Sequence, residues 1–490
     1  MNAPSLLTRR GFLDRGLRLA LGASAAAALN TPAFLRRAVA AGAVPPGTRK
    51  LLFIFLRGGN DSVNTVIPWG DDAYAPRHRP TLHLPAPDPQ SITPGQMPVD
   101  SDPTRVIDLG NGFAGVHPAL RDLAPLYNAG ELAVVHRVGY PKQSRSHFDS
   151  QRYWENGTPH DDFNSTGVLY RAMVETGLHE GRTFPAVSVQ RTPPLILRGP
   201  VAFPSLSDPE RYDLLGVADD GADKAKLLAA ITAAHREPHP TKDNRELLYG
   251  TGGTLQNSIE TLKAVGVDQN DFFDTDGTTH LFPIDRESNQ KGFPSSAYRF
   301  FRYLKVATQI LAGTDAVIAG TQLTGFDTHN RQGALDGKHA GLLARLGWAL
   351  YAVRRFLLDA DPALWRDTVV VTLSEFGRTS KENGSNGTDH AEAGAMFVAG
   401  GGIAGGVYQC DNDSWTVGDE GSLFAVKGRY LGRAVDYRSV LGELIRKHLG
   451  ATEAQLTRII PGYADPAEHL REGGDAPDGT PIVGELNLRG

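Results

Sequence analysis

Two short segments each place an aspartate beside a histidine, a combination of side chains that binds divalent cations. Asp327 and His329 are two residues apart after an apolar run, and in extended backbone such residues project to the same side. Asp389 and His390 are adjacent in a glycine-rich stretch. Carboxylate oxygen together with imidazole nitrogen suits zinc or another divalent metal of similar preference. One such pair is equally consistent with a structural salt bridge, but two pairs favour a metal site.

Two further acids, Glu375 and Asp61, follow apolar runs and are also candidate metal ligands. A buried charge without a partner is strongly destabilising, so each acid needs something positive nearby. For Glu375 the partner is either a metal or Arg378, three residues later. For Asp61 it is either a metal or Arg57, and the two glycines before Asp61 permit close approach of a ligand.

A serine precedes a predicted helix at 148–155, and this end of a helix is positive and suited to anions. Ser146 is either an ordinary helix cap or a nucleophile. The neighbouring Arg145 favours the second interpretation because a guanidinium can hold two oxygens of a phosphate-like group. A nearby metal would lower the pKa of the hydroxyl. Arg378 is the second candidate for holding the anion.

Three other histidines, His117, His136 and His339, are interpreted as packing or capping residues. His339 is the one to reconsider as a ligand, because it opens a long predicted helix only ten residues after His329.

The elements that must position these residues alternate along the chain. Apolar runs predict buried strands, and most of them end at one of the polar clusters; these runs are 51–56, 132–136, 316–319, 369–373 and 395–399. Leucines and a valine spaced by three and four predict a helix over 342–357. This alternation predicts an α/β fold with a doubly wound, mainly parallel sheet and helices on both faces. Ligands of such sheets bind outside the carboxyl ends of the strands, where the clusters fall.

The composition excludes several classes of protein. Residues 1–40 hold six of the 50 basic residues and one of the 55 acidic residues, so the remaining chain has a formal charge of −10. A chain without a basic field is not expected to bind nucleic acid. Cys410 is the only cysteine, which excludes an intramolecular disulfide and a cysteine zinc site. No segment after residue 40 is long and apolar enough to span a membrane.

The N-terminal residues predict export. The segment 8–13, with Arg9 and Arg10, resembles a twin-arginine (Tat) signal; an apolar run at 19–29 and a small-residue cleavage site at 38–40 follow it. We therefore expect a signal peptide over 1–40, the Tat translocase as a partner during export, and a periplasmic or extracellular destination. One catalytic domain is expected over 45–465, with an insertion or cap at about 205–295. A flexible tail is expected over 466–490.

Five motifs in one order carry a resemblance to a known family: 57–65, 146–151, 325–329, 374–379 and 388–390. Together they resemble a widespread bacterial family of Tat-exported proteins labelled only as a domain of unknown function. That family looks like a remote branch of the alkaline phosphatase and sulfatase superfamily, which implies an alkaline phosphatase-like fold. The resemblance covers about 50–462.

The resemblance also implies roles for single residues. It places Asp61 and Glu375 at one metal, Asp327, His329 and His390 at the other, and Ser146 at the nucleophile. Where the superfamily follows its late acidic ligand with histidine, this chain has Phe376. One or two ions, zinc in the first place, are therefore expected. Neither Ser144 nor Ser146 is followed by the proline of the sulfatase motif, which disfavours sulfatase chemistry.

Two functions are consistent with these residues. The first is a metal-dependent hydrolase of phosphate esters or related anionic esters, with a small anionic molecule or an envelope polymer as substrate and Ser146 as nucleophile. The second is a non-catalytic protein that binds an anionic cell-envelope glycan or a partner protein at the same strand ends. Phe376 in place of a ligand is the feature that favours the second.

Overall fold

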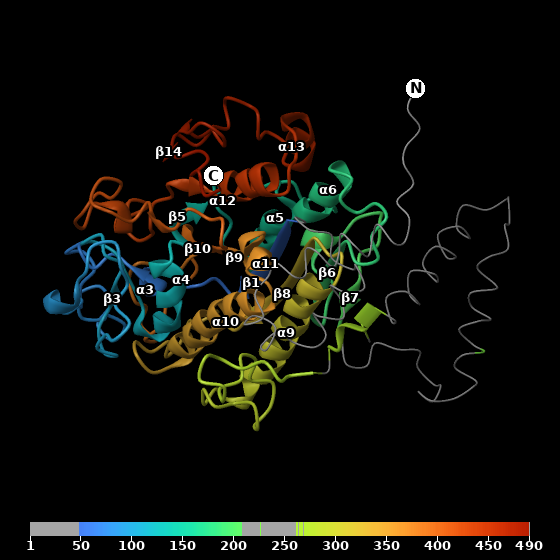
Figure 1. Ribbon diagram of the computed structural model, residues 1–490. Coiled ribbons are helices and arrows are strands. Elements are labelled where there is room, and N and C mark those ends of the chain that lie inside the picture. The colour runs from blue at the N-terminus through green and yellow to red at the C-terminus, as the bar shows by residue number, and fades with distance from the viewer. Residues whose placement is uncertain (1–48, 208–225, 227–260, 263, 268, 490) are drawn as a thin grey trace.

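A computed structural model describes residues 49–207, 226, 261–262, 264–267 and 269–489 of the chain. The signal predicted at 1–40 lies outside these residues, as does most of the helical part of the insertion expected at 205–295. Two strands predicted from the sequence, at 51–56 and 369–373, lie next to each other at the centre of the structure as β1 (Lys50–Arg57) and β9 (Thr368–Leu373) (Figure 1).

A mixed, mostly parallel sheet organises the fold. The strand order is β11-β5-β10-β9-β1-β8-β6-β7, and β12 also pairs with β5. The remaining strands of this sheet are β5 (Leu132–Gly139), β6 (Ala186–Val189), β7 (Ser205–Leu206), β8 (Ile318–Thr324), β10 (Gly394–Ala399), β11 (Gly406–Tyr408) and β12 (Val435–Asp436). Small sheets are formed by β2 (Val66–Ile67), β3 (Ile107–Asp108) and β4 (Gly115–Val116), and by β13 (Gly474–Asp475) and β14 (Pro481–Ile482).

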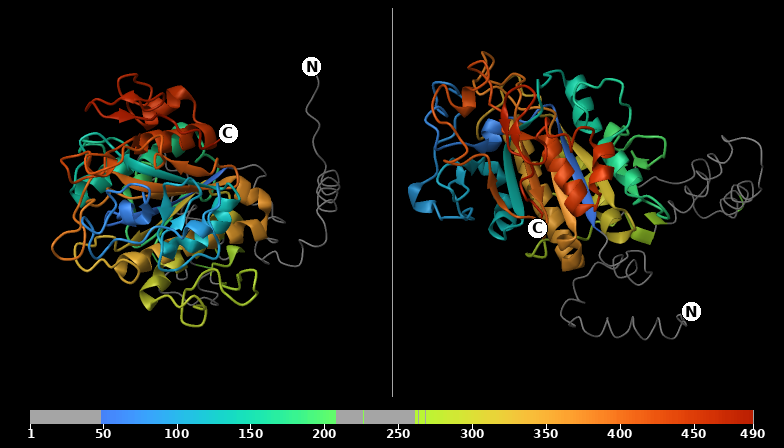
Figure 2. Two further views of the ribbon diagram at one scale, coloured as in Figure 1. Left: turned by 90° about the vertical axis from the view of Figure 1, so that its left-hand side faces the viewer. Right: turned by 90° about the horizontal axis from the view of Figure 1, so that it is seen from above.

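Helices cover both faces of the large sheet, so the predicted α/β class is confirmed. Side chains alternate along β1, so that Leu52, Ile54 and Leu56 face one core and Leu51, Phe53 and Phe55 face the other. The first core packs against α4 (Ala124–Asn128), α9 (Tyr298–Gly313), α10 (Lys338–Ala360) and α11 (Pro362–Arg366). The second packs against α5 (His147–Asn156), α6 (Val168–Glu175), α12 (Tyr437–Glu443) and α13 (Glu453–Ile459). The turned views show α10 and the red C-terminal helices on opposite sides of the sheet (Figure 2).

The periodic helix and the five apolar strands are all present. In α10 the residues that predicted the helix, from Leu342 to Leu357, are buried against the sheet and against the 3-10 helix at Pro118–Leu123. The boundaries of β8 differ from the predicted 316–319. The strand begins at Ile318 and continues to Thr324 because its polar residues are paired with β1, a neighbour that the local pattern does not show.

One strand runs against the others. β10 is antiparallel to both β5 and β9, whereas the other pairs in the sheet are parallel. The loop 374–393 therefore connects the carboxyl end of β9 to the beginning of β10 at a single edge of the sheet. The segments that follow β1, β5 and β8 lie at this same edge, because those strands are parallel to β9. Four of the five motifs thus follow strands that end at this edge. The fifth, 388–390, lies in the loop between β9 and β10.

The C-terminal segment differs from the flexible tail expected over 466–490. Leu470 and Leu488 are fully buried in the core that contains α12 and α13, and β13 pairs with β14. The glycine, proline and aspartate content that suggested a loose tail forms turns between these anchored residues. Among the helices of the described residues, none combines the length and the apolar character needed to cross a membrane.

Candidate metal centre

Four side chains from three separate segments meet at the sheet edge. Asp327 lies in the loop after β8, His147 is the first residue of α5, and His390 lies in the loop before β10. Their ligand atoms all lie within 4.8 Å of one another. His329 joins them, with its Nε2 3.1 Å from Asp327 Oδ1 and 2.9 Å from His390 Nε2.

The three imidazoles share one arrangement of their ring nitrogens. The Nδ1 atoms lie 2.8 Å from Glu375 Oε1 for His147, 3.1 Å from Asp389 Oδ1 for His329, and 2.8 Å from the carbonyl oxygen of Arg145 for His390. Carbonyl and carboxylate oxygens only accept hydrogen bonds, so each Nδ1 carries the proton that is donated. In the neutral ring Nε2 is then a lone-pair donor, and the three Nε2 atoms face the Asp327 carboxylate at 3.6, 3.1 and 3.3 Å.

This arrangement fits a divalent metal. Histidines that bind metals in proteins donate their second ring N–H to a carboxylate or a backbone carbonyl, as all three do here. Two Nε2 lone pairs 2.9 Å apart repel each other unless a cation or a proton lies between them. The Nε2 of His147 is buried and has no hydrogen-bond partner. A carboxylate with two or three imidazoles is also a ligand set that zinc prefers.

Glu375 acts on this group through His147. Its side chain is fully buried, and Oε1 accepts hydrogen bonds from His147, from Gln151 Nε2 at 2.9 Å and from the backbone N–H of Gly58 at 2.8 Å. Burial alone would raise the pKa of Glu375, but the hydrogen bonds from His147 and Gln151 hold it below its usual value. The same contact raises the pKa of His147. The partner of the Glu375 carboxylate is therefore the Nδ1–H of His147 rather than Arg378.

Arg378 is fully buried next to Asp327 and makes four hydrogen bonds. It donates to the carbonyl oxygens of Gly58, Gly59 and Thr388 and to Asp327 Oδ1. Burial opposes ionisation of Asp327, but the hydrogen bond and charge of Arg378 lower its pKa to about 2. Arg378 thus fixes the loop after β1 and orients Asp327, and four of its five N–H groups are used in doing so.

Asp61 has a different partner from the two considered in the sequence. Its carboxylate accepts hydrogen bonds from Arg79 at 2.7 and 3.0 Å and from Gln332 at 2.6 Å. Arg79 is 1% exposed, and its charge offsets the effect of burial, so that the pKa of Asp61 is lowered to about 2. Arg57 instead forms an ion pair with Glu155 at 2.6 Å. Asp61 is not part of the group that converges on Asp327.

Ser146 lies between two contributors to the site. It is the N-cap of α5, and its Oγ accepts a long hydrogen bond of 3.5 Å from the backbone N–H of Asp149. The preceding residue, Arg145, supplies the carbonyl that anchors His390, and the following residue is His147. The guanidinium of Arg145 points away to Tyr430, to whose hydroxyl it donates and over whose ring it lies.

The remaining sequence candidates are placed around the site. Asp389 anchors His329 and is itself held by Arg429 at 2.6 Å, so it supports a ligand. Phe376 packs against the rings of His147 and His390, with centroids 4.9 and 4.7 Å away, and limits how those rings turn.

The three histidines interpreted as packing or capping residues do not join the group. His117 caps the 3-10 helix at Pro118–Leu123, and its Nε2 faces the carbonyl oxygen of Ala334. The Nε2 of His136 forms a hydrogen bond with the carbonyl oxygen of Val66. His339, the one reconsidered as a ligand, is fully buried and lies 3.0 Å from Asn60 Oδ1.

His147 is the residue that the sequence reasoning missed. It lies in the motif 146–151, next to the predicted nucleophile Ser146. The available signal was its position directly after the predicted helix cap Ser146, in the segment that follows the predicted strand 132–136, because α5 begins at the same sheet edge. Arg79, which neutralises Asp61, gave no local signal, because it lies in an irregular segment far from any apolar run.

The fold and the site together define an α/β protein with an acid and imidazole group at one edge of a mixed sheet. The chain belongs to the family described as Protein of unknown function (DUF1501), which matches residues 48–422. All five sequence motifs and the four converging side chains fall within the matched residues. No match was found among curated proteins.

Proposed function

We propose that this chain is an exported, metal-dependent hydrolase of phosphate esters or related anionic esters, and a remote member of the alkaline phosphatase and sulfatase superfamily. The observation that carries the proposal is the convergence of three anchored imidazoles on Asp327. Export rests on the twin-arginine segment alone. Replacing Arg9 and Arg10 with lysine should leave the precursor in the cytoplasm, and unchanged export would contradict that part.

His147, Asp327 and His390, with His329 beside them, would hold one ion. The acids expected at a second ion already have partners within the protein, since Asp61 is paired with Arg79 and Glu375 accepts a hydrogen bond from His147. We therefore propose one cation, zinc in the first place, instead of two. A bound divalent cation supplies a Lewis acid that polarises an ester oxygen and lowers the pKa of a neighbouring hydroxyl or water.

Ser146 is the proposed nucleophile because of where α5 begins. Its hydroxyl is on the residue before His147, at the end of a 10-residue helix whose free N–H groups favour a negative group. Attack forms a bond from Ser146 Oγ to phosphorus as the bond to the leaving alkoxide breaks; the hydroxyl proton of Ser146 passes to water, and the alkoxide takes a proton from water. A second water then cleaves the phosphoserine, which releases phosphate and restores the hydroxyl.

A second candidate is a non-catalytic protein that binds an anionic envelope glycan or a partner protein at the same edge. The observation that favours it is the occupation of both arginines predicted to hold the anion. Arg378 is committed to three carbonyls and Asp327, and Arg145 is turned to Tyr430. Such a protein would keep the metal and lack turnover.

The two candidates are separated by metal analysis and turnover of the same preparations. Protein exported in its native host should contain about one divalent ion per chain, hydrolyse 4-nitrophenyl phosphate or its bis ester, and lose activity with a chelator. Ser146→Ala should abolish turnover and retain the ion. Ser144→Ala is the matched control, because it removes a neighbouring hydroxyl whose contacts are the Ser146 N–H and Asp149.

Inactivity of metal-loaded protein on both monoesters and diesters would refute the hydrolase. Absence of bound metal after export would refute both candidates.

A further inference from the structure

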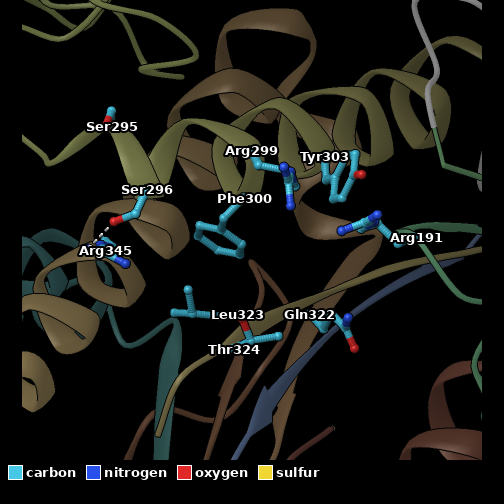
Figure 3. Close-up of a pocket in the computed structure, with 10 residues that line it drawn as sticks. All are labelled: Arg191, Ser295, Ser296, Arg299, Phe300, Tyr303, Gln322, Leu323, Thr324 and Arg345. Atoms are coloured by element: carbon cyan, nitrogen blue, oxygen red, sulfur yellow. Dashed lines mark hydrogen bonds between the residues drawn. The ribbon is translucent and has the colours of Figure 1, made fainter.

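A pocket of about 550 Å³ lies between the beginning of α9, the end of β8 and α10 (Figure 3). Its volume is in the range of small-molecule binding sites. Three arginines, Arg191, Arg299 and Arg345, line it, and among the residues that the structure describes no acid does. In Figure 3 Arg191 and Arg299 extend toward each other at one end, Arg345 lies at the other beside Ser296, and the ring of Phe300 projects between them.

The lack of carboxylates sets these arginines apart from others in the chain. Arg57 and Arg79 each have an acid within 2.7 Å. Within the part of the chain that the structure describes, Arg191 and Arg299 have no ion pair or hydrogen bond, and Arg345 contacts only Ser296 Oγ, at 3.2 Å. The Nε of Arg345 is buried without a partner. Three unneutralised guanidiniums around one cavity create a positive potential that attracts an anion.

The pocket and the candidate metal centre lie at the same edge of the sheet. Thr324, which lines the pocket, is the last residue of β8, and Asp327 follows three residues later. Three residues span at most about 11 Å between Cα atoms. A ligand that occupied both places would have to span about this distance.

We infer that this pocket binds an oxyanion group, phosphate, sulfate or carboxylate, of the molecule on which the metal centre acts. Guanidinium groups hold such anions through paired, charge-assisted hydrogen bonds. Phe300 and Leu323 give the carbon skeleton an apolar surface. The inference that the pocket is part of the substrate site rests on the proposed function. The inference that the pocket binds anions does not.

Calorimetric titration of the full chain with inorganic pyrophosphate, after metal has been removed with EDTA and the EDTA dialysed away, tests the pocket without the metal. We expect saturable binding that Arg191→Gln and Arg299→Gln each weaken by about 10-fold or more, the range for a charge-assisted hydrogen bond. Arg105→Gln is the control, since it removes the same charge from an exposed residue beside Asp102. No saturable binding, or equal affinity in all variants, would overturn the inference.

The metal-loaded protein tests whether the pocket binds a part of the substrate. Arg299→Gln should raise the KM for fructose 1,6-bisphosphate, which carries a second anionic group, at least about 10-fold more than the KM for 4-nitrophenyl phosphate. Equal effects on both substrates would overturn the assignment. Inactivity toward both, with pyrophosphate binding intact, would count against the hydrolase and leave the anion pocket standing.

Discussion

The substitution Glu375→Gln isolates the contribution of a buried charge that supports His147, a ligand of the proposed cation. Glutamine keeps the acceptor oxygen that receives hydrogen bonds from His147, Gln151 and the N–H of Gly58. It removes the negative charge that fixes the His147 tautomer and raises the basicity of Nε2. Loss of such a supporting partner costs 10–100-fold in metal affinity, which corresponds to about 1.4–2.7 kcal/mol. We expect zinc affinity to fall by this amount while the fold is retained.

Competition with a chromophoric chelator measures the affinity, and Glu155→Gln is the matched control. Glu155 is also a buried glutamate, 4% exposed, and its carboxylate binds Arg57 and the N–H of Ile196. The control should unfold more easily and bind zinc as the unsubstituted protein does. Equal zinc affinity in Glu375→Gln and the unsubstituted protein, or equal losses in both variants, would refute the role assigned to Glu375.

Two further predictions concern stability. Arg79→Met leaves Asp61 buried without its cation, so the free energy of unfolding should fall by about 3–5 kcal/mol while the metal content stays the same. Urea denaturation measures this change, and a fall of less than about 1 kcal/mol would contradict the role of the ion pair. Burial lowers the pKa of four histidines to about 4 or 3, against about 6.5 in the unfolded chain, so protons bind the unfolded state first as the pH falls below 6.5. These histidines are His117, His136, His339 and His448. Each should lower the free energy of unfolding by about 2 kcal/mol at pH 5. An unfolding midpoint that calorimetry finds to be the same at pH 7 and pH 5 would refute this prediction.

The parts of the fold that could be predicted are those with a strong local pattern. The five strands and the helix α10 follow from apolar runs and from leucine spacing, which report burial directly. The direction of β10 could not be predicted, because an apolar run is the same whether its neighbour is parallel or antiparallel. The short polar strand pairs and the burial of Leu470 and Leu488 could not be predicted either, because both depend on residues that are distant in the sequence.

The site was predictable by residue type and less so by role. Asp327, His329 and His390 were predicted because two segments each pair an aspartate with a histidine, and the structure places them together. The roles of Glu375, Asp389 and Arg378 depend on which neighbour each side chain meets, and those neighbours come from other segments. Glu375 could not be assigned to His147 from spacing, since the two residues are on different elements.

The position of β10 also bears on when a cation can bind. The group draws on α5, on the loop after β8 and on the loop before β10, and the sheet must be assembled before these segments are adjacent. Binding would then be thermodynamically linked to folding, and amide hydrogens at the beginning of α5 should exchange more slowly in the loaded protein. Because divalent metals differ widely in intrinsic affinity for such ligands, the compartment where folding is completed would decide which ion is acquired.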